Sequence, residues 1–451
     1  MSVLAICALA APGDACAASD RGGHAPLRVS VDGVARAALA ESPLVGVSIG
    51  VSFVGEHFAQ GYGLANLEHE VPASAETVYH LDSISKNITA SAVLRLVEEG
   101  KLSLDEDLGK FVPEFRGRGV LIRHLLNHTS GIKDYSSLPE FEKEERLDLD
   151  HEAVLRLVKD QPADFAPGSS WAYDNSGFYL LGLVIEKVSG QGYFDFVRET
   201  FLKPLGMNAT VYGIAQPIIK HRAQGYIIEH GQQVNADAIS WVPVFSGGAW
   251  CSTVDDTLHW EDALEEGRVV SKEMLEKMRT PTQLPNGPII DYGFGTRIGS
   301  LEGHRCYGHT GTGGGFANVM LSFPDDQLRI VVLKNSEGTL AATTIAARLA
   351  RAILELPLPS KVEPTLSEQE LARFTGKFKS SEGVVEGFAR DGHLWARIGS
   401  SGEGSRLRYQ GEGVFSIGEE SIVRFWPAEG QAEWGLQYNG GLFLSAARRV
   451  R

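Results

Sequence analysis

The sequence predicts an α/β (α+β) protein of two lobes, an antiparallel sheet with a helical lobe, followed by a small all-β up-and-down barrel. Three observations support this fold class. Strand-like segments lie at both ends of the first 355 residues. Between them, from Ser83 to about Met278, apolar residues recur mostly at helical spacing. After a proline-rich segment, short strand-like segments recur every eight to twelve residues.

The first sheet is expected to be assembled from both ends of this region. Its predicted strands are Val45–Phe53, His57–Gly63, His304–Gly311, Phe316–Phe323 and Leu328–Asn335. Helices are predicted at Arg28–Glu41 and from about Leu340 to Leu354. Because the chain between the two groups of strands is mostly helical, we expect the helical lobe to be inserted into a single antiparallel sheet.

The C-terminal part of the chain has a different pattern. Residues 356–368 contain three prolines and are predicted to form a linker. Residues 369–451 contain eight short strand-like segments with glycine-rich turns, which predicts the barrel. We expect its aromatic side chains to form the barrel core rather than to contact a ligand; these are Phe374, Trp395, Tyr409, Phe425 and Trp434.

Residues 1–19 have the pattern of a signal peptide, although no Lys or Arg precedes the apolar run. This predicts a periplasmic or secreted protein. The formal net charge of −15 argues against a nucleic-acid partner, and no apolar run is long enough to span a membrane. After the signal segment only Cys251 and Cys306 remain, without metal-ligand spacing, so we expect no disulfide scaffold, metal or organic cofactor.

The pattern Ser-x-x-Lys occurs twice, at Ser83–Lys86 and Ser130–Lys133. Only the first pair begins a helix with a wide apolar stripe, formed by Ile84, Ile88, Ala92 and Leu96. At a helix N-terminus, unpaired N–H groups and the dipole favour a developing oxyanion, and a desolvated lysine one turn on can accept the serine proton. The alternative is an N-cap serine with a lysine that faces solvent. The second pair lies in "NHTSGIKDY", where Gly131 predicts a loop.

Three further stretches place polar groups at the ends of predicted elements. They are Tyr173-Asp174-Asn175 before an apolar helix, Gly247-Gly248 before a helix cap at Ser252/Thr253, and His309-Thr310-Gly311 at the end of a strand. Ser-x-x-Lys, Tyr-x-Asn and His-Thr-Gly, in this order, resemble the active-site motifs of the serine β-lactamase-like superfamily. That superfamily includes class C β-lactamases, D-alanyl-D-alanine carboxypeptidases, D-aminopeptidases and esterases. The flanks "LVEEGKLSLDEDLGKFVPE" and "IRHLLNHTSGIKDY" also resemble it.

The resemblance implies a hydrolase domain over residues 27–355, and the barrel resembles the lipocalin-like C-terminal domains of some peptidases in this group. It implies that Ser83 is the acylated nucleophile and that Lys86 and Tyr173 are the general base and acid. Asn175 would orient Lys86 and the substrate amide. Asn175 could also form an Asx turn before the helix, and both roles are compatible.

His309 stands where class C β-lactamases typically have lysine. Histidine is only partly charged near pH 7, and we expect the His309 imidazolium to help hold a substrate carboxylate, with weaker binding as pH rises. The alternative is that His309 is neutral throughout and only donates a hydrogen bond. Thr310 could hydrogen-bond the same carboxylate. Gly311 would let a substrate backbone approach the strand edge. The backbone N–H groups of Ser83 and Thr312 would form the oxyanion hole.

Together these features predict a serine hydrolase that forms an acyl-enzyme on Ser83. The expected substrates are peptides or amides with D-residues, or related esters. A β-lactamase is the alternative with the same chemistry, and a penicillin-binding sensor without turnover is the alternative from another class. The barrel could cover the pocket mouth or mediate a homo-oligomer.

Overall fold

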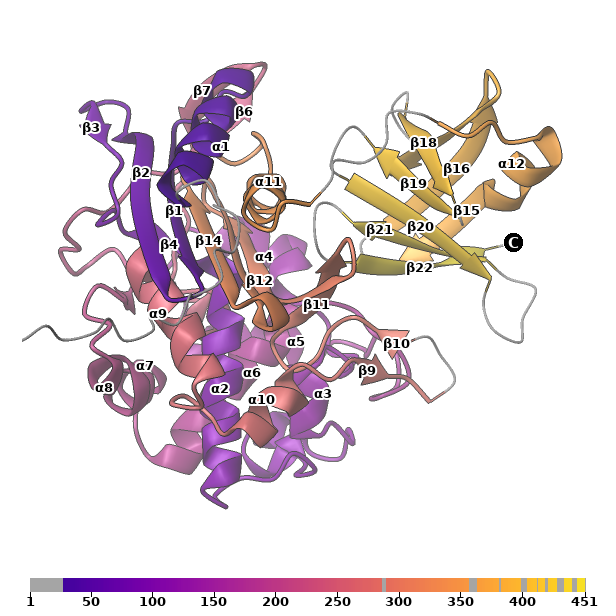
Figure 1. Ribbon diagram of the computed structural model, residues 1–451. Helices are drawn as coiled ribbons and strands as arrows, with labels where there is room; N and C mark the ends of the chain where they lie inside the picture. Colours follow the sequence, from indigo (N-terminus) through magenta and orange to yellow (C-terminus); the bar gives the residue numbers. More distant parts are fainter. Residues whose placement is uncertain are drawn as a thin grey trace, which may run out of the picture.

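The computed structural model describes residues 27–285, 289–356, 363–380, 383–398, 404–411, 413–417, 421–427, 434–439 and 444–450 (Figure 1). The predicted signal peptide, residues 1–19, lies outside these residues, as do residues 357–362 of the predicted linker. Within the described ranges, no helix combines the length and the apolar character needed to cross a membrane.

A seven-stranded antiparallel sheet forms the centre of the first unit, in the order β11-β12-β13-β14-β1-β2-β3. Its strands are β1 (Gly46–Phe53), β2 (Glu56–Asn66), β3 (Val71–Pro72), β11 (Arg297–Leu301), β12 (His304–Gly313), β13 (Phe316–Phe323) and β14 (Leu328–Lys334). In the middle of the sheet β1 pairs with β14, so that Val47 lies opposite Lys334. The prediction that both ends of the region complete one sheet is therefore confirmed.

Helices pack on both faces of this sheet. They are α1 (Leu27–Glu41), α9 (Val254–Glu265) and α11 (Ala342–Ile353). Val47 and Val51 share a buried core with α1 and α11 and, an even number of residues apart on one strand, point to the same face. On the opposite face, a Cβ at Gly50 would lie 2.7 Å from Leu258 Cδ1. Glycine at this position therefore lets α9 pack closely on the strand.

The helical lobe is inserted between β3 and β11. Its helices are α2 (Ser85–Glu98), α3 (Ile122–Leu126), α4 (Pro139–Glu144), α5 (His151–Val158), α6 (Asn175–Ser189), α7 (Tyr193–Val197), α8 (Lys203–Leu205) and α10 (Lys272–Met278). Its short strands are β4 (Tyr79–His80), β5 (Val211–Tyr212), β6 (Tyr226–Glu229), β7 (Gln232–Asn235), β8 (Trp250–Ser252), β9 (Thr282–Gln283) and β10 (Ile289–Ile290). A 3₁₀ turn, η1 (Asp82–Ile84), leads into the buried helix α2, so Ser83 precedes the α-helix rather than beginning it.

The C-terminal unit is a closed barrel in which each strand pairs with the next and the first pairs with the last. Its strands are β15 (Gly376–Ser380), β16 (Gly383–Arg390), β17 (His393–Ile398), β18 (Ser405–Gly411), β19 (Val414–Ile417), β20 (Ser421–Pro427), β21 (Trp434–Asn439) and β22 (Leu444–Val450). The predicted up-and-down barrel is confirmed. It has a core cluster of its own, separate from those of the first unit (Figure 1).

The short helix α12 (Glu368–Phe374) contributes to this barrel core. The Phe374 ring lies 4.9 Å from the Phe415 ring and 5.2 Å from the Phe425 ring, measured between centroids. The expectation that Phe374 and Phe425 are core residues is confirmed, and Tyr409 packs against the same cluster. Trp395 differs: its neighbours Leu394 and Ala396 are buried, whereas the Trp395 ring lies under the Arg390 guanidinium. The Trp434 side chain lies outside what the structure describes.

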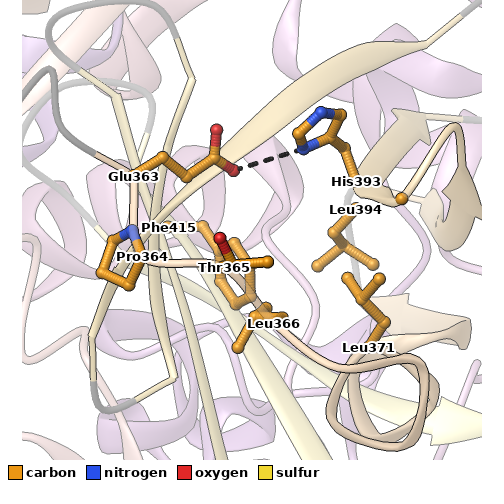
Figure 2. Close-up of a pocket in the computed structure, with 9 residues that line it drawn as sticks. Glu363, Pro364, Thr365, Leu366, Leu371, His393, Leu394 and Phe415 are labelled. Atoms are coloured by element: carbon orange, nitrogen blue, oxygen red, sulfur yellow. Dashed lines mark ion pairs between the residues drawn. The ribbon is translucent and has the colours of Figure 1, made fainter.

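The segment before α12 lies against the barrel at a small pocket (Figure 2). Glu363 forms ion pairs there with Arg406 at 2.6 Å and with His393 at 3.7 Å. Leu366, Leu394 and Phe415 line the same pocket. These contacts tie the end of the predicted linker to the barrel.

Candidate active site

Ser83 lies where the sheet meets the helical lobe. Strand β12 passes directly beside its turn, because a Cβ on Gly311 would lie 2.1 Å from the Leu81 carbonyl oxygen. From Thr77 to Leu94, every residue except Ser83 is buried. The fold therefore exposes one hydroxyl within an otherwise buried segment, at the start of a helix.

Lys86 lies one turn after Ser83, and its side chain is buried. Its Nζ donates to Ser83 Oγ at 2.9 Å, to Asn175 Oδ1 at 2.8 Å and to the Gly247 carbonyl oxygen at 2.9 Å. An ammonium group has three N–H donors, and all three have acceptors here. Lys86 thus connects the turn at Ser83 to Asn175 and Gly247, which are distant from it in the sequence.

The Tyr173 hydroxyl is buried, and it has no hydrogen-bond partner among the residues that the structure describes. Two cations lie near its ring: Lys86 Nζ is 5.0 Å and the Arg297 guanidinium carbon 5.6 Å from the ring centroid. A buried hydroxyl without a partner costs free energy and suggests a functional explanation.

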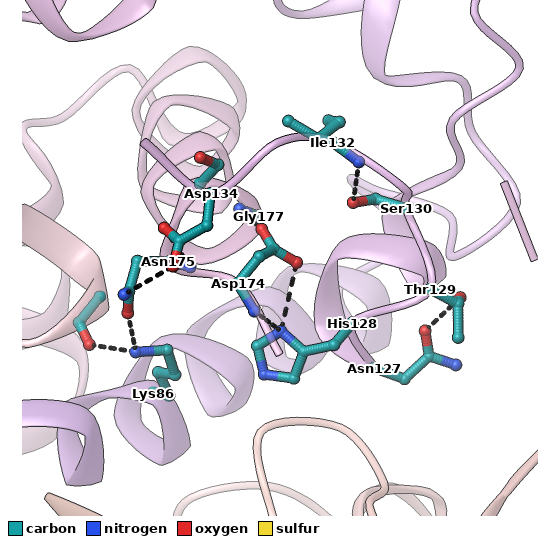
Figure 3. Close-up of polar contacts among 12 residues, drawn as sticks. Lys86, Asn127, His128, Thr129, Ser130, Ile132, Asp134, Asp174, Asn175 and Gly177 are labelled. Atoms are coloured by element: carbon teal, nitrogen blue, oxygen red, sulfur yellow. Dashed lines mark hydrogen bonds and ion pairs between the residues drawn. The ribbon is translucent and has the colours of Figure 1, made fainter. Parts of the chain in front are cut away.

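Asn175 is oriented by the loop that contains the second Ser-x-x-Lys (Figure 3). Its Nδ2 donates to Ser136 Oγ at 2.8 Å, and its backbone N–H donates to Asp134 Oδ1 at 3.2 Å. This places the Asn175 carbonyl oxygen toward Lys86. The helix cap is formed by Asp174, which accepts from the Gly177 N–H, so the Asx turn considered for Asn175 belongs to its neighbour.

Ser130 and Lys133 have structural contacts instead. Ser130 is buried, and its Oγ accepts from the Ile132 N–H at 3.1 Å (Figure 3). Lys133 pairs with Asp164 on the surface. The difference between the two Ser-x-x-Lys pairs is therefore visible in exposure and in partners, as the flanking sequence indicates.

The end of β12 carries the His-Thr-Gly motif. Pairing with β11 ends at Gly308, whereas pairing with β13 continues to Gly313. The strand therefore has one open edge along Thr310 and Thr312, where an extended substrate could add by main-chain hydrogen bonds. Glycine is needed at position 311 for another reason than the predicted one. The Leu81 carbonyl oxygen occupies the space that a side chain would fill, so this space is not open to substrate.

The prediction that His309 carries a positive charge is wrong. His309 is fully buried, its Nδ1 donates to the Thr310 carbonyl oxygen at 2.6 Å, and its Nε2 accepts from the Tyr292 hydroxyl at 3.0 Å. Burial, and then the positive charges of Arg297 and Lys86, lower the pKa of His309 well below its usual value. The imidazole is neutral near pH 7, so it does not provide a cation for a substrate carboxylate.

Comparison with known proteins gives the family. The family model described as Beta-lactamase matches residues 31–355. The chain belongs to the β-lactamase family. Over 296 residues it is 31% identical to Penicillin-binding protein 4* of Bacillus subtilis (strain 168), which covers 62% of this chain and 65% of that protein. It is 25% identical to the D-aminopeptidase of Gluconobacter oxydans (strain 621H), over 77% of this chain and 64% of that protein. The chain thus spans slightly less than two thirds of the length of these relatives.

Solved structures of β-lactamase-family proteins share the fold. The octameric penicillin-binding protein homologue from Pyrococcus abyssi superposes with a TM-score of 0.67 and 27% identity, over 94% of this chain and 100% of that chain. The D-stereospecific amidohydrolase from Streptomyces sp. gives a TM-score of 0.62 and 25% identity, over 72% of this chain and 98% of that chain. The first of these matches extends beyond the hydrolase domain into the C-terminal unit.

The neutral His309 gives a prediction about pH. Since its pKa is lowered, His309 would gain a proton only well below pH 6.5 and stays neutral between about pH 6 and pH 8. We expect KM for a substrate with a free carboxylate and KM for its neutral ester analogue to follow parallel curves across this range. A selective rise in KM for the carboxylate substrate, abolished by His309→Lys, would contradict this expectation.

Several residues at the site have no motif that marks them in the sequence. Asp134 and Ser136 orient Asn175, and the Gly247 carbonyl accepts from Lys86. Arg297 begins β11, a strand that the sequence pattern does not predict, and places its guanidinium over Tyr173. The sequence gives a weak indication that Asp134 and Ser136 belong to the site, because they closely follow the "NHTSGIK" stretch that resembles the family.

Proposed function

We propose that this chain hydrolyses amide bonds of D-residue-containing peptides or amides, or related esters, through an acyl-enzyme on Ser83. The observation that carries the proposal is Lys86, which donates to the partly exposed Ser83 hydroxyl, to Asn175 and to Gly247 and lies 5.0 Å from the centroid of the Tyr173 ring. A serine before a helix, a lysine one turn on and a tyrosine hydroxyl without a partner among the described residues are groups that acyl transfer can use.

In the proposed acylation Tyr173 acts as a phenolate: Ser83 Oγ attacks the substrate carbonyl carbon while its proton passes to the Tyr173 oxygen, which gives the neutral phenol. Tyr173 is better suited than Lys86 to accept this proton, because all three Lys86 N–H bonds already have acceptors. Tyr173 then donates the proton to the leaving amine, and water completes the hydrolysis by the reverse roles. We assign the oxyanion to the backbone N–H groups of Ser83 and Thr312.

The substrate class rests on the relatives. A D-aminopeptidase at 25% identity and a D-stereospecific amidohydrolase of the same fold at 25% identity support D-residue amides. The open edge of β12 beside Ser83 would accept an extended backbone. The second candidate is a penicillin-binding protein that is acylated without fast turnover, and a relative of that name at 31% identity supports it.

A panel of matched substrates tests this function. We expect kcat/KM for the D-alanine p-nitroanilide to exceed that of the L-enantiomer by about tenfold or more, since pocket shape decides between enantiomers. Nitrocefin and p-nitrophenyl butyrate report β-lactam and simple ester turnover in the same assay. An equal rate for both enantiomers would contradict the proposal, and a penicillin adduct that persists for hours without product would favour the second candidate.

Two further assignments belong to the same proposal. The barrel mediates a homo-oligomer, and residues 1–19 direct export to the periplasm or the medium. The first is supported by the penicillin-binding protein homologue from Pyrococcus abyssi, which is octameric and covers 94% of this chain. Light scattering on the full chain and on a chain ending at Leu358 tests this assignment, and an unchanged subunit number would contradict it.

A further inference from the structure

A chain of buried hydrogen bonds connects the Tyr-x-Asn segment to the His-Thr-Gly strand. The Asp174 backbone N–H donates to His128 Nδ1 at 3.2 Å, and His128 Nε2 lies 3.1 Å from the Tyr292 hydroxyl. That hydroxyl lies 3.0 Å from His309 Nε2, and His309 Nδ1 lies 2.6 Å from the Thr310 carbonyl oxygen. The side chains of His128, Tyr292 and His309 are almost completely buried.

The direction of every bond in this chain follows from its two ends. A carbonyl oxygen only accepts, so His309 carries its proton on Nδ1 and has a bare Nε2. Tyr292 must then donate to that nitrogen, and its oxygen accepts from His128 Nε2–H. His128 Nδ1 is therefore bare, which suits the Asp174 N–H at the other end. Both histidines are neutral in this arrangement, and all their ring nitrogens have partners.

The charges around the chain agree with two neutral histidines. Burial first, and then Lys86 and Arg297, lower the pKa of His128 well below its usual value, as they do for His309. Burial raises the pKa of the Asp174 carboxyl, which lies 3.4 Å from His128 Nδ1, to about 7. The other titratable neighbour is Tyr173, whose ring lies 4.3 Å from the His128 ring between centroids.

We propose that Tyr292 is a positioning residue for the active site: its hydroxyl donates to His309 Nε2 and holds the orientation of the His309 ring, and thereby the position of the Thr310 carbonyl and of the edge of β12 relative to Tyr173. This inference rests on the proposed function of the site. Tyr292 suits the role because its own backbone is fixed. Thr282 donates to the Tyr292 carbonyl oxygen with both its N–H, at 3.1 Å, and its Oγ1, at 2.7 Å.

Tyr292→Phe removes the central hydroxyl and leaves a bare His309 Nε2 and a His128 Nε2–H without their partner in the protein interior. We expect kcat/KM to fall about 10- to 100-fold, because a small displacement of the strand that binds substrate misaligns the reacting groups. We also expect the ¹⁵N resonance of His309 Nε2 to shift, because this bare nitrogen loses its hydrogen-bond donor, while Nδ1 keeps its proton through its bond to the Thr310 carbonyl. Labelling of Ser83 by a fluorophosphonate should remain, because Lys86 keeps its contacts.

Tyr179→Phe is the matched control. Tyr179 is a buried tyrosine whose hydroxyl contacts His151 Nδ1 at 2.6 Å, away from the chain of hydrogen bonds described above. We expect this variant to keep the His309 Nε2 resonance of the wild type and to keep kcat/KM within about twofold. A second pair tests the same chain from its other side: His128→Gln retains an N–H near the Nε2 position and should keep more activity than His128→Leu.

The His309 Nε2 resonance and the labelling need no knowledge of the substrate, so the inference can fail separately from the proposed function. An unchanged Nε2 resonance of His309 in Tyr292→Phe would overturn it. A loss in Tyr179→Phe as large as that in Tyr292→Phe would also overturn it, as would equal activity of His128→Gln and His128→Leu. If Tyr292→Phe fails to fold, the His128 pair decides.

Discussion

Ser83→Ala is expected to abolish both turnover and covalent labelling by a fluorophosphonate probe. Ser83 is the one residue between Thr77 and Leu94 that is not buried, and its hydroxyl accepts from Lys86 at 2.9 Å. Removal of a nucleophile that acts together with its base typically lowers kcat by about 10⁶-fold, so residual activity should be at the limit of detection. Labelling is measured by mass shift, and turnover with the chromogenic D-substrate.

The second Ser-x-x-Lys provides the control for this prediction. Ser130→Ala should keep wild-type labelling, because Ser130 is buried in a turn and its lysine pairs with Asp164. This variant can lose some stability, since the Ile132 N–H loses its acceptor. Wild-type labelling in Ser83→Ala, or loss of labelling in a folded Ser130→Ala, would show that the wrong serine has been assigned.

Tyr173→Phe and Lys86→Ala are each expected to lower kcat/KM by about 10²- to 10⁴-fold, the range of general acid–base groups. The two are proposed to act on one proton transfer: Tyr173 takes up the proton, and Lys86 Nζ lies 5.0 Å from the Tyr173 ring centroid and 2.9 Å from Ser83 Oγ. Their losses should therefore be non-additive, with the double variant little worse than the poorer single variant. Independent losses that multiply fully would contradict a coupled pair.

Tyr173→Phe and Lys86→Ala should have different effects on the stability of the fold. The Tyr173 hydroxyl has no partner within the described residues, so Tyr173→Phe should leave the free energy of unfolding unchanged or slightly higher while activity falls. Lys86→Ala removes a buried cation from three acceptors and should lower the melting temperature. Lys133→Ala, which removes a surface ion pair, is the matched lysine control and should change neither quantity much.

Local sequence patterns predict much of this fold. The strands from Phe316 to Phe323 and from Leu328 to about Lys334 are visible because buried, β-branched residues are bounded by a tight "PDD" turn. The proximity of Ser83 and Lys86 follows from their separation of three residues at a helix start. By contrast, β11 contains Gly299 and Ser300, which have low strand propensity, and its place in the sheet comes from pairing with β12.

Local sequence patterns do not predict contacts between segments that are distant in the sequence. Lys86 and Gly247 are 161 residues apart, and nothing in their spacing indicates a hydrogen bond. The expected charge of His309 is wrong for the same reason. Histidine is partly charged when exposed, but burial beside Tyr292 and two cations makes this one neutral. The protonation state of His309 depends on the residues packed around it, and the His-Thr-Gly motif alone does not indicate which residues these are.

Peptide mapping of the intact acyl-enzyme tests the central claim most directly. Full-length protein is mixed with a D-residue ester or amide, quenched in acid within the first turnovers, digested and analysed by mass spectrometry. The account predicts a mass increase equal to the acyl part of the substrate on the peptide that contains Ser83, and its disappearance as substrate is exhausted. An adduct on another residue, or turnover of the D-substrate without any adduct on Ser83 under conditions in which a fluorophosphonate labels it fully, would contradict the account.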